Sequence, residues 1–152
     1  MPQLVNNERS PFTDVVRLTA ADFIAIGNGG QRRIATIPAG GAVELCTITN
    51  TIDIAGSSSL VVDIGTTVGD PDEFIDALNV SSATVGLPVS NTGDAFVQTA
   101  GNTTIKGGSL PVSAVSTATP IVIEVTDAAV ASITAGEVVI GLRILDLTKF
   151  AA

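Results

Sequence analysis

The sequence predicts an all-β protein: a jelly-roll-like β-sandwich of eight or more short antiparallel strands, with one short helix and an extended N-terminal arm. The apolar residues are mostly Val, Ile and Ala, and Thr and Ser are frequent. β-Branched residues of this kind suit the pleated surface of a sheet. Several segments alternate apolar and polar residues with a period of two. These segments recur about every ten residues between turn residues, which is the spacing of a sandwich or barrel.

The chain has 152 residues, of which 45% are hydrophobic and 14% charged, and its mean hydropathy is +0.51. Such a composition excludes global disorder, and the length suits a single domain. Residues 1–13 show no periodicity and are bracketed by Pro2 and Pro11. We therefore expect residues 1–13 to form an arm and residues 14–152 a single β-sandwich domain.

The long alternating run after Cys46 is the clearest strand. Its period predicts that Thr47, Thr49, Thr51 and Asp53 face outward, and Asn50 interrupts the apolar row as a bulge would. The expected strands are 14–19, 22–26, 32–37, 43–54, 60–68, 120–126 and 137–147, with weaker ones at 83–89, 95–99 and 110–115.

Two local patterns predict the connections. The Asn-Gly pair at 28–29 favours a tight hairpin between strands 22–26 and 32–37. Asp70, Pro71 and Glu73 suit the N-cap, N1 and N3 positions of a short helix that ends near Asn79. The residues expected on the core face of this helix are Phe74, Ile75 and Leu78. A single helical turn is also expected within 127–132.

Charge and residue content exclude several function classes. Seven Lys and Arg stand against fifteen Asp and Glu, giving a net charge of −8. No basic face is available to bind nucleic acid or an anionic membrane. No apolar stretch is long enough for a transmembrane helix, and residues 1–10 contain no apolar signal segment. Without His, Trp or Tyr, the chain lacks the usual general base, a common metal ligand and the usual sugar-stacking rings. We therefore expect neither an enzyme nor a cofactor.

Two further candidates for chemistry have plain structural explanations. Cys46 is the single cysteine and is expected to be a small buried hydrophobe within a strand. The densest acidic cluster does not have the spacing of an EF-hand loop, and no metal site is expected there. Whether its members bind an ion is left open by the sequence; they are Asp63, Asp70, Asp72 and Asp76, with Glu73 between them.

The order of turns and strands over most of the chain resembles that of small virion structural proteins of tailed bacteriophages, in particular capsid decoration or cement proteins. The segments that carry the resemblance are 37–40 (Ile-Pro-Ala-Gly), 60–65, 70–75 and 134–147. The resemblance implies a jelly-roll-like sandwich that binds the major capsid protein lattice. It also implies a homo-oligomer, with a trimer favoured, located on the capsid surface of the virion and assembled in the host cytoplasm.

Apolar anchors and an arginine at the two ends of the chain are the expected partner contacts. They are Leu4, Val5, Arg9 and Phe12 in or beside the arm, and Phe150 near the C-terminus. A tail, neck or fibre component of a phage is an alternative, because it could show the same order of strands and turns. A carbohydrate-binding or adhesive β-sandwich is a further alternative, which the lack of Trp and Tyr disfavours.

Overall fold

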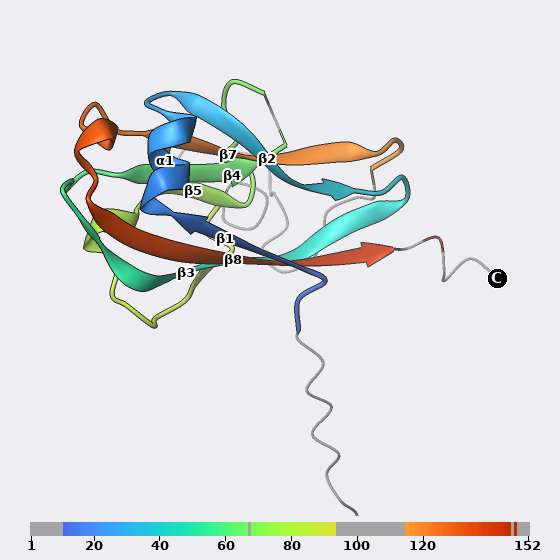
Figure 1. Ribbon diagram of the computed structural model, residues 1–152. Helices are drawn as coiled ribbons and strands as arrows, with labels where there is room; N and C mark the ends of the chain where they lie inside the picture. Colours follow the sequence, from blue (N-terminus) through green and yellow to red (C-terminus); the bar gives the residue numbers. More distant parts are fainter. Residues whose placement is uncertain (1–10, 67, 94–114, 147, 149–152) are drawn as a thin grey trace, which may run out of the picture.

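A computed structural model describes residues 11–66, 68–93, 115–146 and 148, which form two four-stranded antiparallel sheets packed face to face (Figure 1). Sheet A contains, in spatial order, β1 (Asp14–Thr19), β8 (Ala135–Asp146), β3 (Gly41–Ala55) and β6 (Val89–Ser90). Sheet B contains β2 (Gly30–Ile37), β7 (Thr119–Thr126), β4 (Val61–Gly65) and β5 (Ile75–Asn79). The predicted β-sandwich with eight strands is confirmed.

The strand pairing is that of a jelly roll. β1 pairs with β8, β2 with β7, β3 with β6 and β4 with β5, as in one long hairpin folded over itself. Two further pairings, β3 with β8 and β4 with β7, join the neighbouring arms of this hairpin into the two sheets. An eight-stranded double sheet of this kind is the jelly-roll arrangement, so the expected fold class is confirmed.

The core lies between the sheets and is built by alternation. In β8 the inward residues Val138, Ile140 and Leu142 are fully buried, and in β7 the inward residues Ile121, Ile123 and Val125 are fully buried. Aliphatic side chains of this kind from the two inner faces fill a core about 10 Å thick. The residues between them in sequence point to the outer faces, as the period of two predicts.

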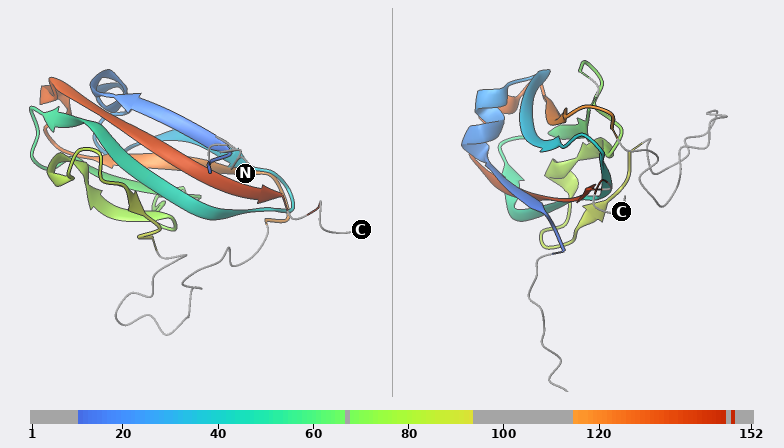
Figure 2. Two further views of the ribbon diagram at one scale, coloured as in Figure 1. Left: turned by 90° about the horizontal axis from the view of Figure 1, so that it is seen from below. Right: turned by 90° about the vertical axis from the view of Figure 1, so that its right-hand side faces the viewer.

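The strands β3 and β8 lie side by side along almost the whole sandwich (Figure 2). The pairing shifts register between Asn50 and Ile52, which confirms the bulge expected at Asn50. The Asn50 amide is buried and donates a hydrogen bond to the Val80 carbonyl at 2.7 Å. Thr47 lies on the outer face as expected but is only 8% exposed, since it lines a groove there between β8 and β6. Thr51 is exposed as expected.

One predicted strand is a helix. Residues 22–26 belong to α1 (Ala20–Ile26), so the predicted strand and the hairpin after it are wrong. The Thr19 backbone N–H and hydroxyl both donate to Asp22 Oδ2 at 2.9 Å, which fixes the first turn. Phe23 is fully buried beneath this helix. The helix ends where Gly27, at φ 80°, donates its N–H to the Phe23 carbonyl.

The helix expected over 70–79 is also wrong, because residues 75–79 form β5. The Glu73 carboxylate accepts hydrogen bonds from the Thr66 N–H at 2.8 Å and the Thr66 hydroxyl at 3.1 Å, and so closes the turn after β4. Phe74 and Ile75 are nevertheless buried, as expected.

The remaining elements are short. The turn η2 (Val130–Ser132) is the helical turn expected within 127–132, and η1 (Val80–Ser82) follows β5. The strand expected at 83–89 is wrong except at Val89, where β6 begins, because the Leu87 N–H donates to the Thr84 carbonyl at 3.1 Å and closes a turn. The strands expected at 95–99 and 110–115 fall, apart from Val115, outside the described residues. No helix among the described residues is long and apolar enough to cross a membrane.

Candidate docking surface on sheet A

The outer face of sheet A carries a groove of about 450 Å³. Segments that are far apart in the sequence line it: Phe12, Thr47, Thr49, Thr51, Gly86, Pro88, Ser90, Val139 and Gly141. The strand register produces this gathering. Thr47 lies opposite Gly141 on one side and Ser90 on the other, and Thr49 lies opposite Val139. The small and β-branched side chains of these paired residues form the shallow floor of the groove.

Phe12 forms one wall of the groove. The Thr13 N–H donates to the Leu142 carbonyl at 2.8 Å, and the Ile144 N–H donates to the Thr13 hydroxyl at 3.0 Å. These bonds hold the backbone so that the Phe12 ring lies over Gly141. A Cβ at Gly141 would stand 2.6–2.8 Å from three ring carbons of Phe12. Glycine makes room for the ring here, because the ring occupies the position that a side chain at residue 141 would take.

The opposite wall is the segment that leads into β6. The Gly86 N–H donates to the Asn50 carbonyl at 2.8 Å and ties this segment to β3. Beyond β6, Asn91 has φ 51° and continues the ladder with its side chain. Its Oδ1 accepts from the Cys46 N–H at 2.8 Å, and its own N–H donates to the Cys46 carbonyl at 3.0 Å. Asn tolerates this left-handed conformation better than most residues.

Exposed apolar side chains flank the groove. Ile52 on β3 is 50% exposed, and Val85 and Leu87, in the segment before β6, are 43% and 59% exposed. Val15 on β1 is 57% exposed. Scattered single apolar residues are ordinary on a surface, whereas several around one apolar groove mark an interaction surface.

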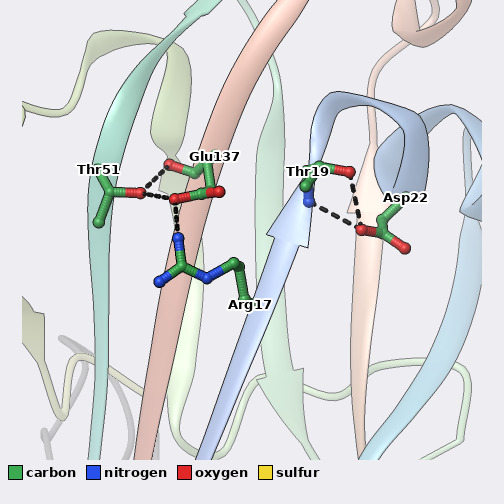
Figure 3. A network of polar contacts seen from close by, with 5 residues as sticks. All are labelled: Arg17, Thr19, Asp22, Thr51 and Glu137. Carbon is green, nitrogen blue, oxygen red and sulfur yellow. Dashed lines mark hydrogen bonds and ion pairs between the residues drawn. The ribbon is translucent and has the colours of Figure 1, made fainter.

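The charged groups around the groove are paired. Arg17 forms an ion pair with Glu137, and the Thr51 hydroxyl donates to Glu137 Oε1 at 2.5 Å (Figure 3). Arg143 Nε lies 2.9 Å from Glu44 Oε2 at the other end of the groove. The charges of these two bases and two acids therefore cancel, and Asp53, exposed on β3, adds one negative charge to sheet A.

The outer face of sheet B is different, because Asp63 and Glu124 lie directly opposite each other. Like charges at such positions repel. Burial, above all, raises the pKa of Asp63, and the charges of Asp76, Glu124 and Asp70 raise it further, against the hydrogen bond from the Ala77 N–H. Within the described ranges, no three acidic, Cys or His side chains are grouped so that they could hold a metal ion.

The structure describes one of the five expected partner contacts. Phe12 is half-buried in the groove, while Leu4, Val5, Arg9 and Phe150 lie outside the described residues. Sequence reasoning missed Val139, Gly141 and Pro88. The outward period of the threonines was the available signal, but it does not reveal which strands lie beside them. Cys46 is buried, as expected, and burial raises the pKa of its thiol to about 12.

No protein-family model matches the sequence, and no curated protein matches it significantly. Solved structures do. A chain of the cyanophage Pam1 capsid asymmetric unit matches at 16% identity and a TM-score of 0.55, over 85% of this chain and 78% of that one. A chain of the Ralstonia phage GP4 capsid also matches, at 14% identity and a TM-score of 0.49, over 88% of this chain and 85% of that one. A chain of the acid-stable capsid of Helicobacter pylori phage KHP30 matches at 12% identity and a TM-score of 0.43, over 88% of this chain and 86% of that one. The chain thus shares its fold with a chain of a phage capsid assembly.

Proposed function

We propose that this chain is a non-enzymatic structural protein of a phage virion, and specifically a decoration or cement protein. It binds the outside of the head and stabilises the lattice of the major capsid protein. The observation that carries the proposal is the jelly roll shared over 85% of the chain with a chain of the cyanophage Pam1 capsid asymmetric unit.

Chain size favours an accessory role over that of the main shell protein. The aligned region makes up 85% of this chain and 78% of the Pam1 chain, so the Pam1 chain is only slightly longer. At 152 residues, this chain is small for a subunit that builds a whole shell. A protein that binds only the assembled lattice stabilises it by mass action.

The two ends of the chain suit contact with such a lattice. The start of β1 and the end of β8 lie at the same end of the sandwich, because Asp14 pairs with Leu142 (Figure 1). The described chain therefore enters β1 and leaves β8 at the same end of the domain. Leu4, Val5, Arg9 and Phe150 are the proposed lattice contacts, with Phe12 fixing the root of the arm.

The first experiment measures the copy number of this chain in purified particles, by quantitative mass spectrometry against the major capsid protein. Hundreds of copies are expected for a decoration protein. A handful of copies would contradict that role and favour a tail, neck or fibre component, and absence would remove the virion role altogether.

A second experiment tests the arm. Deletion of residues 1–10 leaves Phe12 and Thr13 in place against β8, so the domain should keep its melting temperature while co-sedimentation with capsids lacking the chain is lost. The double variant Leu4→Ser, Val5→Ser keeps the arm's length and serves as the matched control for its apolar anchors. Full binding by the deletion variant would contradict the role of the arm.

A further inference from the structure

The net charge of −8 sets a condition on any contact between two copies of this chain. Two such chains repel each other unless they meet where charge is balanced. The outer face of sheet B does not meet this condition, because Asp63 and Glu124 face each other there and Asp76 adds to their repulsion.

The outer face of sheet A does meet it. Beside the groove, Arg17 is paired with Glu137 and Arg143 with Glu44, so these four charges cancel. The same patch presents Val15, Ile52 and Leu87, each at least half exposed, on both sides of an apolar groove. An apolar surface whose flanking charges are paired within the chain is compatible with a second copy of itself, as a two-fold contact requires.

The arm adds a second argument. The described chain begins at Pro11, beside the Phe12 wall of the groove, with ten residues before it. Ten residues span at most about 33–36 Å when extended. A sheet of four strands is only about 15 Å wide between its outermost strands. A neighbour packed on this face is therefore within reach of the arm.

We infer that a second copy of this chain packs on the outer face of sheet A, centred on the groove between Phe12 and Pro88. The inference goes beyond the proposed function, because self-association in solution requires no particle. The two therefore fail independently: the copy number in virions tests one, and the mass of the free protein tests the other.

The test is the mass of the purified full chain over a range of concentrations, by light scattering and analytical ultracentrifugation. The native chain should self-associate, and Thr49→Arg, at the centre of the face, should give monomers. Thr126→Arg makes the same substitution on an exposed residue of sheet B and should leave the assembly intact. Because the contact is neutral and the chains are acidic, added salt should strengthen the association.

Three results would overturn the inference: a native chain that stays monomeric at every concentration, a Thr49→Arg variant that assembles like the native chain, or loss of assembly confined to Thr126→Arg. Melting temperatures show whether each variant is folded. If Thr49→Arg fails to fold, Val15→Arg carries the test, because Val15 is 57% exposed on an edge strand of the same face.

Discussion

Replacing Gly141 by alanine should expel the Phe12 ring from the face of sheet A. The new Cβ would lie 2.6, 2.7 and 2.8 Å from three carbons of the ring. Carbon atoms pack at about 3.5–4.0 Å, so the ring has to leave its seat. Residue 141 lies in the middle of β8, and its φ is not in the left-handed region, so an alanine itself is compatible with the backbone.

The expected cost follows from the burial of Phe12. A fully buried aromatic side chain covers roughly 150–250 Å², so half-burial covers about 100 Å². At about 25 cal/mol per Å², losing this contact costs about 2.5 kcal/mol as an upper bound. Alanine in a strand recovers roughly 0.5–1 kcal/mol relative to glycine. The net loss is about 1–2 kcal/mol, or a fall of roughly 2–8 °C in melting temperature for a domain of this size.

The assay is a double-mutant cycle with Gly141→Ala, Phe12→Ala and the combination. Thermal unfolding is followed by far-ultraviolet circular dichroism or calorimetry, because the chain has no Trp or Tyr to report by fluorescence. In the Phe12→Ala background the ring is absent, so Gly141→Ala should become neutral or stabilising. If Gly141→Ala costs the same free energy in both backgrounds, the steric explanation is wrong.

Four further predictions concern single residues. Burial raises the pKa of Asp63, so ionising it above that pKa costs stability; Asp63→Asn should raise the melting temperature at pH 7, with the gain fading as the pH falls towards 3.8. The pKa of Asp22 is lowered to about 2, chiefly by the Thr19 N–H, so Asp22→Asn should cost stability at pH 7, and this cost should shrink as the pH falls from 3.8 through about 2. Unfolding midpoints of each variant and of the native chain, measured at pH 7 and at acidic pH, check the predicted gain for Asp63→Asn and the predicted loss for Asp22→Asn. Cys46 should react with a thiol reagent at neutral pH only after denaturant unfolds the chain, and fast labelling of the native protein would contradict its burial. Asn91→Gly keeps the left-handed backbone but removes the bond to the Cys46 N–H, so it should lower the midpoint less than Asn91→Ala, which loses both; equal midpoints would show that backbone strain plays no part.

The strands that the sequence predicts well are those in which alternation continues over a long run. β7 and β8 carry unbroken apolar rows on one face, and the structure buries those rows almost completely. The period of two is itself the physical cause of that burial, so it can be read directly from the sequence.

The two helix errors arise from one ambiguity. Both the Thr19 to Asp22 segment and the Asp70 to Glu73 segment place an acidic residue three positions after a residue that can cap a helix. In the first segment the acid accepts bonds from its own cap and α1 forms. In the second, Glu73 accepts bonds from Thr66, seven residues earlier, and the chain continues into β5. Contacts with residues distant in the sequence decide whether a helix or a strand forms, and the local spacing of residues does not reveal those contacts.

The groove on sheet A depends still more on distant partners. Thr47 and Thr49 carry an outward period that can be read locally, but their neighbours come from almost one hundred residues further along the chain, since Thr47 pairs with Gly141. Only the nested pairing of β1 with β8 and of β3 with β6 brings Phe12, Gly141 and Pro88 to one face. A one-residue slip of β8 would turn Gly141 inward and present Ile140 to the Phe12 ring. The register of the jelly roll therefore determines whether the Phe12 ring can pack over residue 141. A variant at Gly141 for this reason tests the strand register and the groove together.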